Sequence, residues 1–158
     1  MKQLQLEDSE ARSMYLTASS EIKKILENSF SKAFFSVNIM DRIKTYEDAC
    51  AELGREPLVE KEMKRLGFTD VEIARRKIGI INEALNEGWE ADYSDSNQNK
   101  WRVWIKWVSG GFVFGVTYCD GASAVAGDGS RLCLKSEELA KYSWNQFSEL
   151  YKIITIDK

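Results

Sequence analysis

Apolar and polar residues alternate most regularly within residues 100–135, around the pair Gly110-Gly111. Alternation with a period of two is typical of a β-strand that buries one face, and paired glycines supply the positive φ angles of a two-residue turn. We therefore predict an antiparallel hairpin over residues 101–119, around which the rest of the chain is organised.

The assumed turn assigns the strand residues to two faces. One face is apolar and aromatic, with Trp107 opposite Phe114, and we expect it to be buried. The opposite face is mixed in character and carries Arg102, Trp104 and Lys106. A third strand near residues 131–134 would extend the sheet, although so short a run leaves open which of its sides is buried.

Before the hairpin, apolar residues recur at the three- and four-residue spacing of helices. We predict one long helix from about residue 8 to residue 35, with its apolar stripe in the core, followed by a loop at NIMDR. Thr45 is expected to cap a short helix, and residues 58–66 form another, with Val59 and Leu66 turned inward.

Thr69 and Glu72 match a capping box, in which each side chain satisfies a backbone N–H of the other residue. The helix that begins there is expected to run to Glu87. It carries a basic group that is interpreted either as a solvated edge or as an anion contact: Arg75, Arg76 and Lys77.

A last helix is predicted after Ser136, which is a typical N-terminal cap. Its apolar residues recur at helical spacing and are expected to cover the apolar side of the hairpin: Ala140, Trp144, Phe147, Tyr151 and Ile154. The pattern therefore predicts a single α+β domain over residues 1–158, in which N-terminal helices precede a small antiparallel sheet packed by a C-terminal helix.

Two loops have the composition of ligand sites. Asp92, Ser94 and Ser96 alternate as in a calcium loop, but the glycine and the closing glutamate are missing, so we predict no metal site. Residues 120–130 are rich in glycine and precede Arg131, which favours either a plain connection or a backbone anion site. Whether this loop binds a ligand is left open.

Composition excludes several functions. The chain has no histidine and three widely spaced cysteines, which argues against a His-dependent catalytic dyad, a zinc site and a disulfide framework. A formal net charge of −3 argues against general duplex-DNA binding. The sequence shows no signal peptide and no apolar run of transmembrane length, so we expect a cytoplasmic protein without cofactors and without a membrane partner.

Several stretches resemble an uncharacterised family of small proteins found in Bacteroidetes genomes and in their phages or prophages. The resemblance rests on SMYLTASSEIKKILENSF, on DRIKTYEDACAELG, on the run from Glu72 to Trp89 that ends in ALNEGW, and on GSRLCLKSEELAKYSWNQFSELYK. It spans nearly the whole chain. It implies a mobile-element context and brings no catalytic residue, substrate or cofactor.

Three functions compete on this basis. The favoured hypothesis is a small non-enzymatic interaction protein that binds itself or another protein through the sheet or a helix face, since tryptophan is common at interface hot spots. The second is single-stranded nucleic-acid binding, with Trp104 stacking a base between Arg102 and Lys106. The third, an enzyme, would have to use Asp120, Asp128 or Cys119, and no partner group for them is recognisable.

Overall fold

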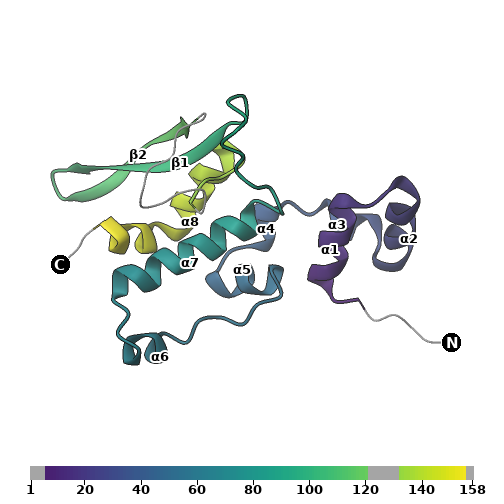
Figure 1. Ribbon diagram of the computed structural model, residues 1–158, viewed down its shortest axis with the longest axis horizontal. Coiled ribbons are helices and arrows are strands. Elements are labelled where there is room, and N and C mark those ends of the chain that lie inside the picture. The colour runs from purple at the N-terminus through teal and green to yellow at the C-terminus, as the bar shows by residue number, and fades with distance from the viewer. Residues whose placement is uncertain (1–5, 121–131, 156–158) are drawn as a thin grey trace.

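Helix α7 (Asp70–Leu85) lies at the centre of the molecule, with α5 (Tyr46–Glu52) and α8 (Glu137–Thr155) packed against it (Figure 1). The structure, a computed structural model, describes residues 6–120 and 132–155, without the side chains of residues 33 and 118–120. The other elements in these ranges are α1 (Asp8–Thr17), α2 (Ser20–Phe30), α3 (Lys32–Ser36), α4 (Ile39–Arg42), α6 (Glu60–Arg65), β1 (Lys100–Val108) and β2 (Gly111–Asp120). The predicted α+β class is confirmed.

The core is aliphatic where α7 meets its neighbours and aromatic where α8 meets the sheet. Ile78, Ile81 and Leu85 of α7 are completely buried. Each such side chain stabilises the fold by about 1.5–3 kcal/mol. Trp144 of α8 packs against Phe114 of β2, with 6.1 Å between the ring centroids. The prediction that the last helix covers the apolar side of the hairpin is confirmed.

The predicted helix over residues 8–35 is wrong, because the chain forms α1, α2 and α3 instead. Ser19 is extended, with ψ at 164°, and Ser31 has a φ of 75°. Short polar side chains such as these hydrogen-bond to nearby backbone groups and favour helix ends over helix interiors. The expected buried stripe is consequently open to solvent, and Ile25 is 63% exposed.

In residues 38–66, the predicted helix cap is confirmed, whereas the predicted burial of apolar side chains is wrong. Thr45 caps the start of α5 as predicted, and it forms a capping box with Asp48. NIMDR is not a loop, since it contains α4, whose first turn is capped by the Asn38 side chain. Helix α6 has no buried residue, and Val59 and Leu66 are 57% and 69% exposed rather than turned inward.

Tyr46 of α5 is buried, and its hydroxyl accepts a hydrogen bond from the Leu58 backbone N–H at 3.0 Å. Burial, together with the neighbouring Cys50 thiol, raises the pKa of Tyr46 from 10.0 to about 12. Folding therefore favours the protonated phenol, so its stabilising contribution is complete below pH 10 and is lost as the pH rises toward 12.

Between pH 9 and pH 11, the free energy of unfolding in urea should fall more for wild type than for Tyr46→Phe. Equal losses would contradict the shift.

The predicted capping box of α7 is confirmed: the Thr69 N–H donates to Glu72 Oε2 at 2.8 Å, and the Glu72 N–H donates to Thr69 Oγ1 at 3.2 Å. The helix ends at Leu85, earlier than the predicted Glu87.

Thr69→Ala should lower the free energy of unfolding by about 1 kcal/mol, because one orphan N–H loses its acceptor. Thr69→Ser keeps the hydroxyl and should retain most of this stability. A urea melt in which Thr69→Ala equals wild type would show that the box contributes nothing.

The hairpin is present, but its register differs from the prediction. Val108 pairs with Gly111 and Trp107 with Phe112, so the two-residue loop is Ser109-Gly110. Only Gly110, at φ 108°, takes a positive φ inside this loop, so it is not the primed turn that was assumed.

A bulge at Gly115 changes the register again between Ile105 and Trp104 of β1. A Cβ atom on Gly115 would lie 3.0 Å from the Trp104 carbonyl oxygen, which explains why glycine occupies the bulge. The predicted third strand is reduced, in the described ranges, to one bridge between Leu134 and Trp101.

Candidate interaction surface

Burial separates the residues that the sequence predicted as one binding face. Arg102 is only 5% exposed, and its Nη2 donates to the Tyr93 hydroxyl at 3.2 Å. Trp104 is 50% exposed, and Lys106 is exposed as well. Arg102 is therefore part of the interior, and only Trp104 and Lys106 lie on an accessible surface.

The loop before β1 covers this end of the sheet because it folds around a lysine. Lys100 is completely buried, and its ammonium donates to the carbonyl oxygens of Asp95 at 2.9 Å and Gln98 at 2.7 Å. The carboxylates of Asp92 and Asp95 accept backbone N–H groups within the loop. The feature that resembles a calcium loop therefore surrounds the chain's own ammonium. Among the described residues, no cluster of acidic or cysteine side chains has a metal-binding arrangement.

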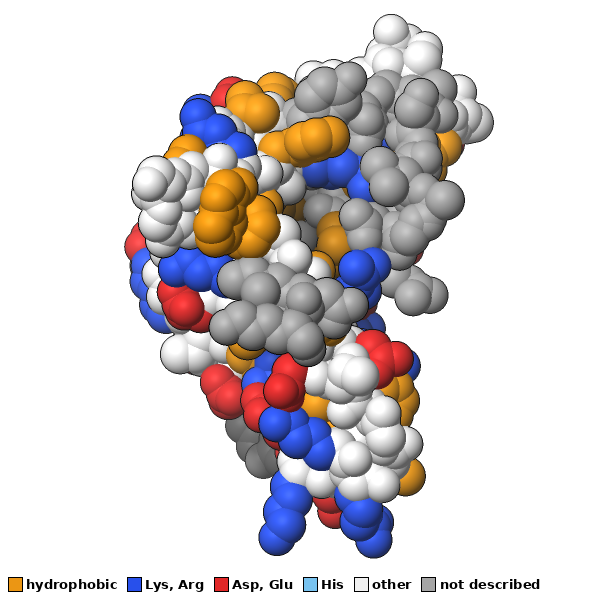
Figure 2. Space-filling view, turned by 90° about the vertical axis from the view of Figure 1, so that its left-hand side faces the viewer, with side chains coloured by type: hydrophobic (Ala, Val, Ile, Leu, Met, Phe, Trp, Pro, Cys, Tyr) orange, Lys and Arg blue, Asp and Glu red, His pale blue; other side chains and the backbone are white. Residues whose placement is uncertain are grey.

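Beyond this loop, the sheet presents an open face that we call the outer hairpin face: Trp104, Lys106, Val108, Val113 and Val116. Trp104 pairs with Val116 and Lys106 with Val113, so these side chains stand together on one side of the strands. Val116 is 54% exposed, and Val108 and Val113 are close to 40%. Figure 2, which views the molecule from the side of the hairpin turn, shows apolar side chains gathered in its upper half.

Trp107 lies on the other face but is not buried as predicted. It is 66% exposed and contacts Phe112 across the strands, with 5.0 Å between the ring centroids. The pair lies next to the turn, and α8 covers Ile105 and Phe114 farther along the strands instead. The turn end of the hairpin is thus apolar on both sides.

Two asparagines that the sequence did not single out hold the segment that follows the second loop. Asn82 lies on the buried face of α7, and Asn86, also buried, is the C-cap residue one turn later. The Asn86 side chain donates to the Cys133 carbonyl oxygen at 2.9 Å and accepts the Lys135 N–H at 2.9 Å. Their spacing on an apolar helix face was the signal available in the sequence.

Asn82 also belongs to a hydroxyl cluster with Ser143 and Tyr151. Ser143 Oγ donates to Asn82 Oδ1 at 2.8 Å and lies 2.9 Å from the Tyr151 hydroxyl. Burial raises the pKa of Tyr151. Ser143 and Asn82 are completely buried, so the cluster satisfies interior polar groups and offers no access to a substrate.

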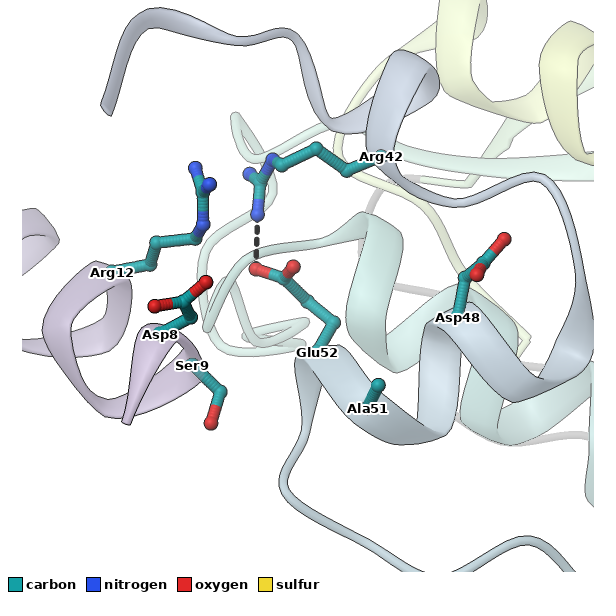
Figure 3. Close-up of a pocket in the computed structure, with 7 residues that line it drawn as sticks. All are labelled: Asp8, Ser9, Arg12, Arg42, Asp48, Ala51 and Glu52. Atoms are coloured by element: carbon teal, nitrogen blue, oxygen red, sulfur yellow. Dashed lines mark hydrogen bonds and ion pairs between the residues drawn. The ribbon is translucent and has the colours of Figure 1, made fainter. Parts of the chain in front are cut away.

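A hollow of about 280 Å³ lies where α1 meets α4 and α5, lined by Asp8, Ser9, Arg12, Arg42, Asp48, Ala51 and Glu52 (Figure 3). Its arginines are engaged by the fold. Arg42 pairs with Glu52 and, at 2.6 Å, with Glu87. Arg12 donates to the Phe34 carbonyl oxygen, and burial together with the nearby Arg42 charge lowers its pKa. The charged residues of this hollow therefore connect the helices to one another.

The predicted anion contacts do not converge. Lys77 pairs with Glu60 and lies over the Tyr46 ring at 4.9 Å, whereas Arg76 lies over the Phe68 ring at 4.8 Å. Arg75 is exposed. Arg131 lies outside the described residues, as do Asp128 and the side chains of Cys119 and Asp120. Of the other two cysteines, Cys50 is a buried free thiol, and Cys133 is buried with its Sγ 3.4 Å from the Tyr93 hydroxyl.

No family model, curated protein or solved structure matches this chain. The function is therefore inferred from the surface itself. In the described part of the chain, none of the helices has the length and apolar character needed to cross a membrane.

Proposed function

We propose that the protein is a small non-enzymatic interaction protein that binds another protein through the outer hairpin face. The observation that carries this proposal is an open sheet face on which Trp104 and Val116 pair with half of each side chain exposed. Sheet faces normally bury such residues, and an exposed apolar patch on a folded protein is typical of a binding site. An exposed tryptophan in such a patch is typical of an interface hot spot.

The single-stranded nucleic-acid alternative has less support. This interpretation needs cations on both sides of the stacking ring, whereas Arg102 is buried against Tyr93 and Lys106 lies opposite Val113. Binding of a nucleic-acid strand depends on several phosphate contacts, which one exposed lysine does not provide.

The cellular setting is part of the same proposal. We infer a cytoplasmic accessory protein of phage or mobile-element type, which rests on the family resemblance of the sequence. The buried free thiol of Cys50 is compatible with a reducing compartment.

Affinity purification from host lysate tests the proposal. Wild type should retain a protein partner after nuclease treatment. Trp104→Asp should lose this partner, because burying an unpaired carboxylate in the interface costs free energy. Leu66→Asp is the matched control, since Leu66 follows the last residue of α6, away from the hairpin, and is 69% exposed. Retention that is lost with nuclease, or that is insensitive to Trp104→Asp, would contradict the proposal.

A further inference from the structure

The outer hairpin face is small. Interfaces of stable dimers involve about 20–30 residues on each side, whereas this face consists of Trp104, Lys106 and three valines. From Trp104 to Val108 the strand advances four residues, or about 13 Å. A helix of two to three turns, at about 5.4 Å per turn, spans the same length. The size of the outer hairpin face therefore fits a short helical segment of a partner better than a second folded domain.

The charge pattern narrows the chemistry of this segment. Lys106 is the single charged side chain of the outer hairpin face, and its cross-strand neighbour is Val113. Covering an ammonium with apolar groups is costly unless a carboxylate pairs with it. A second copy of this chain would bring another Lys106 to the same small area and no acid. A partner that places Asp or Glu beside apolar residues meets both requirements.

The layering of the fold favours a helix as the partner element. Helix α8 already covers the inner face of the two-stranded sheet, through Trp144 against Phe114. Sheets in α and β proteins are commonly covered by helices, which bury an apolar stripe against the strands. A helix on the outer face would complete a helix–sheet–helix arrangement.

We propose, on the basis of the proposed function, that the outer hairpin face receives a short amphipathic helix of a partner protein. Its apolar side chains pack on Trp104, Val113 and Val116, and one of its carboxylates pairs with Lys106.

A phage-displayed library of random helical peptides provides the probe. Peptides selected on wild type are expected to carry apolar residues at helical spacing next to Asp or Glu. Their affinity should fall about tenfold or more for Trp104→Ala and for Lys106→Glu, the usual size of a hot-spot or charge-pair loss. Replacing the peptide acid by lysine should restore binding to Lys106→Glu. Circular dichroism first establishes that both variants fold, and Leu66→Ala should bind as wild type.

The outcomes separate the two proposals. Peptides that need Trp104 but carry no acid and ignore Lys106→Glu would overturn the helix chemistry and leave the proposed function in place. The same holds if no peptide is enriched. A dimer in light scattering that Trp104→Ala dissociates would overturn both proposals, because a second copy of this chain would then occupy the face. Peptides that bind Trp104→Ala as well as wild type would contradict the use of this face altogether.

Discussion

Trp144→Ala is expected to lower the free energy of unfolding by about 3–5 kcal/mol, the range observed when a buried aromatic site is emptied. The Trp144 side chain is 7% exposed and packs between Phe114 and Tyr151, so its removal opens a cavity between α8 and the sheet. Urea denaturation measures the loss.

The matched control for this prediction is Trp107→Ala. Trp107 is 66% exposed, so the same substitution should cost about 1 kcal/mol or less, as is usual for surface positions. A larger loss for Trp107 than for Trp144 would mean that α8 does not cover the sheet in this way.

Lys100→Met should be the second large effect, with a loss of about 2–3 kcal/mol, the cost of leaving buried carbonyl groups without the charged donor that they share. Methionine keeps the length and apolar stem of lysine, so packing changes little. The lost donor leaves the Asp95 and Gln98 carbonyl oxygens without the ammonium.

Hydrogen exchange should locate the damage caused by Lys100→Met in residues 92–98, because the ammonium holds this loop together. Lys106→Met, which changes an exposed lysine, is the control and should leave stability and exchange unchanged. If Lys100→Met were as stable as wild type, the loop would not depend on the buried charge.

Local features of this fold could be predicted because they depend on residues three or four positions apart. The capping boxes at Thr45 and Thr69 and the cap at Ser136 involve only neighbouring groups, and all three are present. The covering of the hairpin by the last helix followed from two strong apolar periodicities that could be buried only against each other.

Features that depend on distant contacts could not be predicted. The hairpin register follows from a turn at Ser109 and a bulge at Gly115, and neither is specified by the alternation alone. Arg102 is buried because Tyr93 reaches it from a preceding loop. Alternation alone placed Trp104, Lys106 and Val113 on one face, whereas adding Val116 required the bulge at Gly115 to be known.

Hydroxyl-radical footprinting with peptide mass spectrometry tests the central claim most directly, because it measures the solvent accessibility of each tryptophan in the isolated protein. Trp104 and Trp107, at 50% and 66% exposure, should be oxidised rapidly, and Trp144, at 7%, should be protected. This result would establish an open outer hairpin face. Protection of Trp104 to the same degree as Trp144 would show that the face is covered within the chain, which would contradict the account.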